Sequence, residues 1–263
     1  MHQRTFTPNT NLGQNFLINR EIVRQIIVRA NLNSNDVVLE IGPGQGVLSR
    51  AILESPCSHL HSVEIDRRLE SYLRDCEGPR FSLHWGDGVT FPYETLTPCP
   101  NKVVANIPYH VTTPLLWALL EKLAPLGLQY LILMVQKEAA DRLVAHEGTK
   151  DRYPLGIAIE AMGQAKVYMK VSPGSFRPIP RVHSALVEIW IDDQRELAQD
   201  SIWRRILRGG FAQRRKKLTN NLTVLGYEKN ELLSAFEQAG ISPSARAEDL
   251  TSDQWLALRR AIQ

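Results

Sequence analysis

Short apolar runs alternate with segments of helical periodicity along the first part of the chain. Residues 20–31 carry apolar side chains at the spacing of an amphipathic helix, namely at Ile22, Val23, Ile26 and Ile27. The apolar run Val37–Ile41 leads directly into Gly-Pro-Gly, which is typical of a buried strand that ends in a turn. Asp66 stands where it can cap a following helix. By the same criteria we predict strands at residues 61–65, 81–85, 102–105 and 131–135, and helices at residues 47–53, 66–75, 113–122 and 137–145.

This alternation predicts the fold class. Strands that are almost continuously apolar and alternate with helices indicate an α/β domain built on a parallel sheet. The pattern changes after Tyr168, where residues 166–171 and 184–191 flank a Pro-rich loop and are expected to form a closing antiparallel pair. Beyond residue 192 only helical periodicity remains, at residues 203–211, 217–225, 228–239 and 253–262. We therefore predict an α/β domain at residues 1–192 and a small all-α domain at residues 193–263.

Composition adds little to this picture but excludes some classes of protein. Hydrophobic residues make up 43% and charged residues 22% of the 263 residues, which is ordinary for a soluble enzyme. No apolar run approaches the roughly 20 residues that span a bilayer, and the first residues lack the apolar core of a secretory signal. We therefore expect a cytoplasmic protein. The sequence has no Cys-x-x-Cys or His-Glu-x-x-His pattern, and we expect no metal site.

Charge is concentrated in one segment, although the formal net charge is only +3. From Ser201 to Tyr227 there is no acidic residue. Such a run is either a solvated helix face or a patch that contacts nucleic-acid phosphates. The candidate phosphate contacts are Arg204, Arg205, Arg208, Arg214, Arg215, Lys216 and Lys217.

A glycine motif, Glu40–Gly46, follows the first predicted strand of the sheet. The turn between such a strand and the next helix is where open α/β sheets bind ligands. Gly42 and Gly44 would allow the backbone to approach a ligand closely, because they have no Cβ atom. Dinucleotide sites use the spacing Gly-x-Gly-x-x-Gly, whereas the tighter Gly-x-Gly-x-Gly seen here suits S-adenosylmethionine, which has no phosphate. A purely structural turn is the alternative for this motif taken alone.

Two acidic residues strengthen the prediction of a nucleoside site. Glu64 ends the second predicted strand, about 20 residues after the glycine motif, where a carboxylate can accept hydrogen bonds from both ribose hydroxyls. Asp87 lies in a Gly-Asp-Gly turn after the third strand, where it can accept from the cofactor's adenine amino group. Taken alone, Asp87 would be interpreted as a turn residue.

The tetrapeptide Asn106-Ile107-Pro108-Tyr109 follows the fourth predicted strand and therefore belongs to the same edge of the sheet. The Asn106 side-chain oxygen and the carbonyl of Ile107 or Pro108 could accept the two hydrogens of an adenine amino group. They would then direct the nitrogen lone pair toward a sulfonium methyl, so that positioning carries most of the rate effect. Pro108 would restrict the backbone, and Tyr109 would offer a ring for the base to stack on.

With these motifs in place, the sequence resembles the ribosomal RNA adenine N6-dimethyltransferase family, and within it the small-subunit (16S) enzymes. The resemblance runs nearly end to end. It is carried by Gly13–Leu17, Glu40–Gly46, Asn106–Tyr109, Gln136–Glu138, Phe176–Ser184 and Phe211–Leu218. One departure is His110, where the family commonly has Asn.

The resemblance implies a class I methyltransferase fold with a Rossmann-like sheet and a helical RNA-facing domain. It implies cofactor contacts from Asn15, Leu17, Gly42, Gly44, Glu64, Asp87 and Asn106. It also implies that Phe176 covers the adenine opposite Tyr109. The expected substrate is two adjacent adenines in the 3′-terminal hairpin loop of small-subunit rRNA, in a monomeric enzyme that acts on a pre-30S particle during subunit biogenesis.

Three other functions compete with this interpretation. A macrolide-resistance type of enzyme would methylate an adenine of large-subunit rRNA. A catalytically silent RNA-binding or assembly factor could share the fold, although the intact Asn106–Tyr109 motif disfavours it. A nicotinamide oxidoreductase is disfavoured by the glycine spacing and by the lack of a histidine placed for hydride chemistry.

Overall fold

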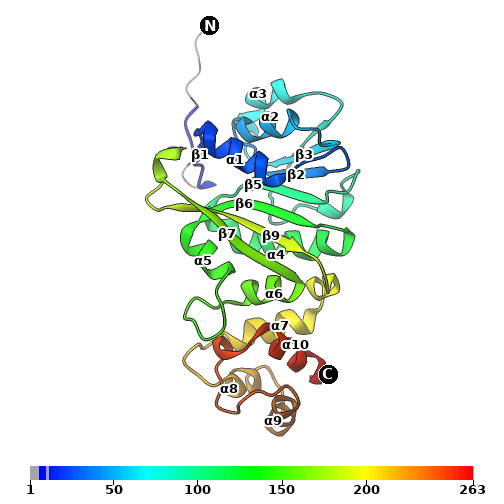
Figure 1. Cartoon of the computed structure of the whole chain (residues 1–263), viewed down its shortest axis with the longest axis vertical. Helices are drawn as coiled ribbons and strands as arrows, with labels where there is room; N and C mark the ends of the chain where they lie inside the picture. Colours follow the sequence, from blue (N-terminus) through cyan, green and yellow to red (C-terminus); the bar gives the residue numbers. More distant parts are fainter. Residues whose placement is uncertain (1–5, 10–11, 263) are drawn as a thin grey trace. The chain divides into compact units, whose positions relative to one another are not determined.

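The computed structural model describes residues 6–9 and 12–262 and contains a seven-stranded sheet (Figure 1). Its strand order is β4-β3-β2-β5-β6-β9-β7. The strands β2, β3, β4, β5 and β6 pair in parallel. This confirms the α/β fold class with a parallel sheet. The bounds are β2 Val37–Ile41, β3 His59–Glu64, β4 Phe81–Trp85, β5 Lys102–Asn106, β6 Tyr130–Gln136, β7 Gly163–Val171 and β9 Ser184–Ile191.

The chain reverses direction across the sheet between β2 and β5. From β2 it proceeds to β3 and β4 on one side, and then returns to β5 and β6 on the other. The carboxyl ends of the strands around such a switch point form a crevice, because the loops that leave them turn in opposite directions. The glycine motif, Glu64 and Asn106 all lie at these ends.

Most of the predicted helices are present. The helices of the α/β part are α1 Arg20–Ala30, α2 Val47–Leu53, α3 Glu70–Leu73, α4 Thr112–Leu123 and α5 Lys137–Leu143. Asp66 is confirmed as a cap, since its side chain accepts a hydrogen bond from the Arg68 amide. The segment after it is less regular than predicted, because α3 spans a single turn between two short 3₁₀ helices at residues 67–69 and 74–76.

One helix escaped prediction. α6 spans Pro154–Met162, and eight of its nine residues are buried. Only Glu160 is exposed, so the segment has almost no polar face and no amphipathic periodicity from which a helix could be predicted. A second element was too short to predict: β1 Phe16–Leu17 pairs antiparallel with β8 Phe176–Arg177 in a separate two-stranded sheet.

The chain folds into two compact units. The first contains the residues up to Ala140 together with Val167–Glu188, and the second contains Asp141–Lys166 together with the residues from Ile189 onward. The division at residues 192/193 made from the sequence stays a prediction. The helices that follow β9 are α7 Ser201–Gly210, α8 Leu218–Thr223, α9 Lys229–Gln238 and α10 Ser252–Ala261. Trp203 of α7 and Trp255 of α10 are fully buried in the second unit.

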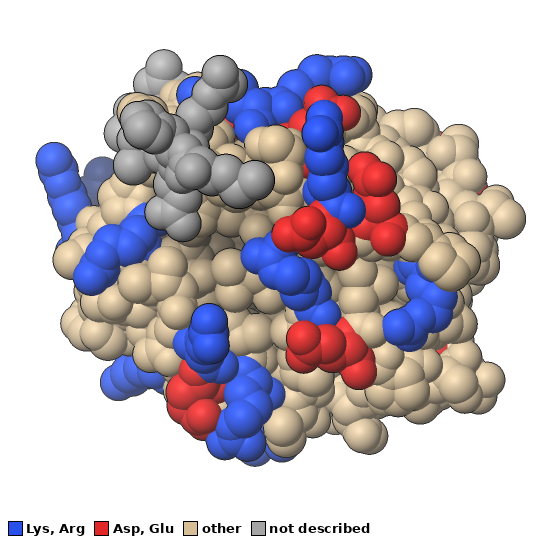
Figure 2. Space-filling model, turned by 90° about the horizontal axis from the view of Figure 1, so that it is seen from above, with Lys and Arg blue, Asp and Glu red and all other residues tan. Residues whose placement is uncertain are grey.

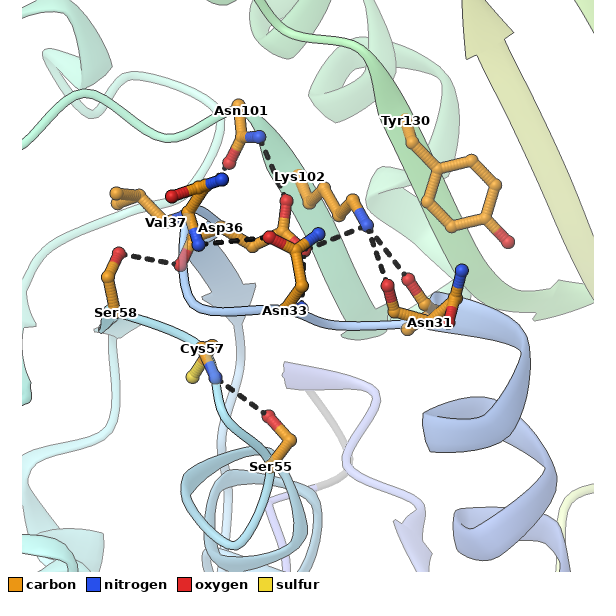
Figure 3. Close-up of polar contacts among 12 residues, drawn as sticks. Asn31, Asn33, Asp36, Val37, Ser55, Cys57, Ser58, Asn101, Lys102 and Tyr130 are labelled. Atoms are coloured by element: carbon orange, nitrogen blue, oxygen red, sulfur yellow. Dashed lines mark hydrogen bonds and ion pairs between the residues drawn. The ribbon is translucent and has the colours of Figure 1, made fainter.

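A polar cluster ties together the amino ends of β2 and β5, opposite the crevice (Figure 3). Asp36, which is 2% exposed, accepts hydrogen bonds from the Asn33 amide, the Asn33 side chain and the Asn101 side chain, at 2.8, 2.8 and 3.0 Å. Lys102 lies 3.0 Å from the same carboxylate and also donates to the last carbonyls of α1. The cluster therefore fixes the start of both central strands.

No helix in the described part of the chain is both long enough and apolar enough to span a membrane.

Candidate functional site

A cavity of about 260 Å³ lies at the carboxyl ends of β2, β3, β4 and β5. Nine of the residues that we proposed from the sequence line it, and these are Asn15, Gly42, Gly44, Glu64, Asp87, Asn106, Ile107, Pro108 and Tyr109. Leu17 and Phe176 are not among the described residues that line it. The structure thus gathers five separate segments of the chain around one space.

Glycines of the glycine loop have a left-handed backbone conformation. Gly42 and Gly44 have φ angles of 68° and 58°, in the left-handed region that residues with a Cβ atom rarely adopt. A Cβ atom on Gly44 would lie 2.8 Å from the ring of Phe16. The glycine is therefore needed both for the turn and for the close approach of Phe16.

Glu40, the acidic residue before the loop, is buried and does not belong to the described cavity lining. Its carboxyl group accepts hydrogen bonds from Ser49 of α2 at 2.6 Å and from Ser62 of β3 at 2.9 Å. Burial raises the pKa of Glu40 to about 7. Glu40 thus joins the elements on either side of the glycine loop and has a supporting role.

Glu64 presents its carboxylate to the cavity and is held by the backbone. One oxygen accepts from the amides of Ile65 and Asp66, both at 2.9 Å, and the other accepts from the Gly44 amide at 3.1 Å. Burial nevertheless raises the pKa of Glu64 above its usual value. The second oxygen has one donor among the described residues and keeps capacity to accept from a ligand hydroxyl.

The neighbouring Asp66 connects the site to the N-terminal part of the chain. Its carboxylate binds Arg68 at 2.6 Å and accepts from the Gln14 side chain at 2.8 Å. These hydrogen bonds, of which that from Arg68 is the strongest, lower the pKa of Asp66 to about 2. Asp66 therefore stays ionised and holds Gln14 at the cavity.

The charge of the cavity argues against a phosphate ligand. Its described lining includes the two carboxylates of Glu64 and Asp87 but no Lys or Arg. Asp87 forms a turn in which one carboxylate oxygen accepts from the Val89 amide at 2.8 Å. Apolar side chains complete the lining, among them Ile65, Val89 and Leu115. Such a site suits a neutral or cationic nucleoside better than a dinucleotide.

The acceptor tetrapeptide is fixed by contacts at each of its residues. The Asn106 side-chain nitrogen donates to the Asn15 carbonyl at 3.1 Å, so that its oxygen is directed away from Asn15. The Ile107 amide donates to the Met134 carbonyl at 3.1 Å. The Pro108 carbonyl accepts from the Val111 amide at 3.2 Å, whereas no backbone amide of the described residues donates to the Ile107 carbonyl. Of the two candidate carbonyls, that of Ile107 is therefore the one left for a ligand.

Tyr109 lies at the start of the short 3₁₀ turn Tyr109–Val111. Its hydroxyl group is 2.6 Å from the hydroxyl of Ser184, which is the fully buried first residue of β9. Burial raises the pKa of Tyr109 above its usual value. Sequence reasoning did not single out Ser184.

Residues 12–16 of the N-terminal segment line the cavity, and the end of this segment pairs with the start of the Pro-rich loop. In the β1–β8 pair, Leu17 lies opposite Phe176, and the Ile18 amide donates to the Ser175 carbonyl at 2.9 Å. Both Leu17 and Phe176 are buried, and Phe176 is fully inaccessible. Their predicted contacts with cofactor and adenine stay predictions, and Phe176 would have to change its exposure to cover a base.

Four lining residues of the same region were not assigned a role from the sequence. Gln14 and Phe16 belong to the motif Gly13–Leu17 that carried the resemblance, and this motif was the signal that could have found them. A Cβ atom on Gly13 would lie 2.8 Å from the His110 ring, and both residues line the cavity. The His110 ring therefore contacts the N-terminal segment at Gly13.

Three histidines lie close together on two neighbouring strands, His59 and His61 on β3 and His84 on β4. The Nε2 atom of His61 lies 2.9 Å from the Pro98 carbonyl and must donate to it, so its Nδ1 accepts from His84 Nε2 at 3.1 Å. Burial lowers the pKa of His61 to about 4. Within the described residues, no group of three or more His, Cys, Asp or Glu side chains is arranged to hold a metal ion.

The basic run falls in the second unit, on α7 and the turn that follows it. Arg204, Arg205 and Arg208 line a shallow hollow with Ser201, Gly209 and Leu225. Arg205 already donates to the Leu225 carbonyl, and Arg214 forms an ion pair with Glu248 at 3.2 Å. Arg215, Lys216 and Lys217 are exposed on the turn. Arg205 and Arg214 of the basic run therefore already bind other groups of the protein.

Elsewhere on the surface, positive and negative side chains are mixed. In the view from above in Figure 2, each group of Asp and Glu side chains lies beside Lys or Arg. Basic side chains without an acidic neighbour occur mainly on the left of that view, next to an uncharged area. Opposite charges therefore compensate each other over much of this face.

The chain is similar to known proteins along nearly its whole length. The family model for ribosomal RNA adenine dimethylase matches residues 5–263. The chain is 38% identical to the ribosomal RNA small subunit methyltransferase A of Rubrobacter xylanophilus, over 98% of this chain and 97% of that protein. It is also 38% identical to the protein of that name from Acaryochloris marina, over 97% of each chain.

Solved structures show the same fold. A dimethyladenosine transferase from Plasmodium falciparum matches with a TM-score of 0.77 and 25% identity, over 92% of this chain and 95% of that one. The 23S rRNA methyltransferase ErmE matches in fold with a TM-score of 0.69 and 23% identity, over 94% of this chain and 99% of that one. On the near-complete match to the family model and to these relatives, the chain belongs to the ribosomal RNA adenine dimethylase family.

Proposed function

We propose that this protein transfers methyl groups from S-adenosylmethionine to N6 of two adjacent adenines in the 3′-terminal hairpin loop of small-subunit rRNA, giving N6,N6-dimethyladenosine. The observation that carries the proposal is the placement of the tetrapeptide Asn106–Tyr109 in the same cavity as the glycine loop and Glu64. A methyl donor and an amino-group acceptor can meet there. The names of the similar proteins from R. xylanophilus and A. marina support the small subunit as the source of the RNA.

The cavity fits S-adenosylmethionine chemically. The free acceptor capacity of Glu64 suits a ribose hydroxyl, and Asp87 suits the amino group of adenine. The positive φ angles of Gly42 and Gly44 bring the loop backbone close to the cavity. Asn15 would contact the cofactor from the N-terminal segment. The part of the lining that the structure describes has no Lys or Arg, and this is also favourable to a sulfonium ion. When bound, this cofactor supplies an electrophilic methyl group.

The protein's own contribution to the reaction is to orient the acceptor amine. In the first transfer the Asn106 side-chain oxygen and the Ile107 carbonyl accept its two hydrogens, since the Asn106 nitrogen and the Pro108 carbonyl are already engaged by other protein groups. In the second transfer the monomethylated amine has one hydrogen left, which one of these two acceptors binds. These two acceptors favour a pyramidal nitrogen and stabilise the positive charge that develops on it. No strong base is required, because the proton can leave after the transfer.

The target base is held by stacking. Tyr109 supplies one ring face, and a base stacked on an aromatic ring gains about 1–3 kcal/mol. Phe176 would supply the opposite face after the Pro-rich loop rearranges to expose it. The adenine must leave its stack in the RNA to enter the cavity, as in other enzymes that modify a nucleobase.

Methyl transfer to isolated subunits tests the proposal. The purified protein should transfer tritiated methyl groups from S-adenosylmethionine to small subunits from cells that lack the modification, and mapping should place two N6,N6-dimethyladenosines in the 3′-terminal hairpin. Fully modified small subunits serve as the control and should accept none. Transfer to large-subunit rRNA in place of small-subunit rRNA would refute the proposal and favour the macrolide-resistance type of enzyme.

We also propose that the basic run of the second unit contacts RNA phosphates. Charge reversal of Arg215 and Lys216 should weaken RNA binding and reduce the slope of log affinity against log salt by roughly 0.7–0.9 for each lost contact, because fewer counterions are released. Binding titrations at several salt concentrations measure this slope. These two residues are a better test than Arg214, whose ion pair with Glu248 would also be broken.

The matched control reverses two exposed basic residues elsewhere in the second unit, Lys229 and Arg260. This control should leave the slope unchanged. An equal change in both variants would show that net charge alone determines binding, and that the run has no special role.

The remaining features of the proposal concern the setting of the reaction. We propose a cytoplasmic monomer that acts on rRNA within a pre-30S particle and thereby takes part in small-subunit biogenesis. In this scheme residues 1–192 bind the cofactor and the adenine, and residues 193–263 face the RNA.

A further inference from the structure

We infer that Ser184 is a positioning residue for the acceptor adenine, because its buried hydroxyl group fixes the ring of Tyr109. The inference rests on the proposed function, in which Tyr109 stacks on the base. Ser184 does not touch the reacting atoms. It acts through the 2.6 Å hydrogen bond between its hydroxyl and that of Tyr109.

The two partners of this bond differ in mobility. Ser184 is fully buried and begins β9, a strand of the central sheet, so its hydroxyl has a fixed place. Tyr109 lies in a short turn and is only partly buried. A bond from the sheet to the turn therefore transfers the rigidity of the sheet to the turn.

Tyr109 is held at both ends by this arrangement. Its backbone carbonyl accepts a hydrogen bond from the Thr112 hydroxyl at 3.1 Å, at the start of α4. The far end of its side chain is held by Ser184. A tyrosine side chain has two rotatable bonds between these points, and fixing its hydroxyl selects one orientation of the ring plane. The phenol is neutral near pH 7, and burial raises the pKa of Tyr109 further above its usual value, so the hydroxyl can donate as well as accept a hydrogen bond.

The place of Ser184 in the chain strengthens the inference. The segment that runs from Phe176 to Ser184 has one proposed adenine contact at its first residue, and at its last residue it holds the other proposed contact, Tyr109. The same segment thereby sets the position of both aromatic rings. Ser184 is buried, and among the described residues its hydroxyl has no hydrogen-bond partner other than Tyr109. Because buried polar groups are normally hydrogen-bonded, the bond to Tyr109 accounts for a serine in this place.

The test compares Ser184→Ala with Tyr109→Phe, which removes the same hydrogen bond from the other end and keeps the ring. Each variant should lower kcat/KM for the RNA by roughly tenfold, since a displacement of about 1 Å in an active site can cost up to about a hundredfold. The double variant should be no worse than either single one, because all three lack one and the same bond. The cofactor Kd, measured by calorimetry, should not change.

A binding measurement separates positioning from a general loss of structure. An RNA hairpin with 2-aminopurine at the target position should show weaker fluorescence quenching on binding to Ser184→Ala than to the unaltered protein, because the base stacks less well. Tyr130→Phe is the control, since it removes another buried tyrosine hydroxyl in the same unit, which bonds Glu188 at 2.7 Å. That variant should lower stability and leave quenching and kcat/KM unchanged.

The outcomes distinguish the inference from the function on which it rests. Normal quenching and kcat/KM in Ser184→Ala would overturn the inference, and so would an effect of Ser184→Ala that persists in full when Tyr109 is already Phe. A Tyr109→Ala variant that remains fully active would instead overturn the stacking role of Tyr109. A Tyr109→Ala variant that is inactive beside a normal Ser184→Ala variant would leave the proposed function intact and refute the positioning role.

Discussion

Replacement of Asn106 by alanine is expected to lower the turnover number by about two to three orders of magnitude, the loss typical when one oriented hydrogen-bonding group of an active site is removed. The side-chain oxygen is one of two acceptors that orient the target amine, and the Ile107 carbonyl alone cannot fix the nitrogen lone pair. The cofactor affinity should fall far less than the turnover number. Single-turnover methyl transfer and calorimetric titration of S-adenosylmethionine measure the two effects separately.

Asn101 offers a matched control for this experiment. It precedes the same strand, β5, at the opposite end, where its side chain donates to Asp36 at 3.0 Å. Asn101→Ala should lower the stability of the fold and leave single-turnover rates unchanged. Equal losses of turnover and cofactor affinity in Asn106→Ala would mean that Asn106 is a binding residue and that the proposed clamp on the amine is wrong.

Alanine in place of Gly44 should weaken S-adenosylmethionine binding by roughly a hundredfold, which corresponds to about 3 kcal/mol of lost binding free energy. Two costs combine at this position. The φ angle of 58° is unfavourable for alanine, and its Cβ atom would lie 2.8 Å from the ring of Phe16. Either the loop or Phe16 must shift, and both line the cavity. Calorimetry on the folded variant, verified by its circular dichroism spectrum, measures the change.

Gly127→Ala isolates the contribution of backbone strain. Gly127 also has a positive φ angle, 105°, but a Cβ atom there would meet no other atom within 4 Å. It follows a short helical turn away from the cavity, so this variant should be less stable and should bind the cofactor normally. Wild-type affinity in Gly44→Ala would show that the loop does not closely approach the ligand.

The sequence was sufficient to predict the sheet and most of the cavity, because both depend on local patterns. A glycine loop after an apolar strand, and polar residues at successive strand ends, need only chain order and parallel pairing to converge. Gly42, Glu64, Asp87 and Asn106 line one space for that reason. Their assigned contacts with cofactor and substrate stay predictions.

Most of the features that could not be predicted from the sequence depend on contacts between residues that lie far apart in the chain. The bond between Tyr109 and Ser184, and the pairing of Phe16 with Arg177, join segments that no periodicity relates. The helix α6 escaped for a different reason, since it is buried on nearly every side and shows no polar face. The ion pair of Arg214 with Glu248 likewise changes which basic residues are available, and charge counting along the chain cannot reveal it.

The Asp36 cluster has a practical consequence for protein engineering. It fastens the amino ends of β2 and β5, whereas the cavity occupies their carboxyl ends. The residues of the Asp36 cluster, which stabilise the fold, and the residues that line the cavity therefore lie at opposite ends of the same strands. A designer who seeks a more heat-resistant variant can alter the surroundings of Asp36 and Lys102 with little effect on the groups that meet the ligand, and so can avoid the usual exchange of activity for stability.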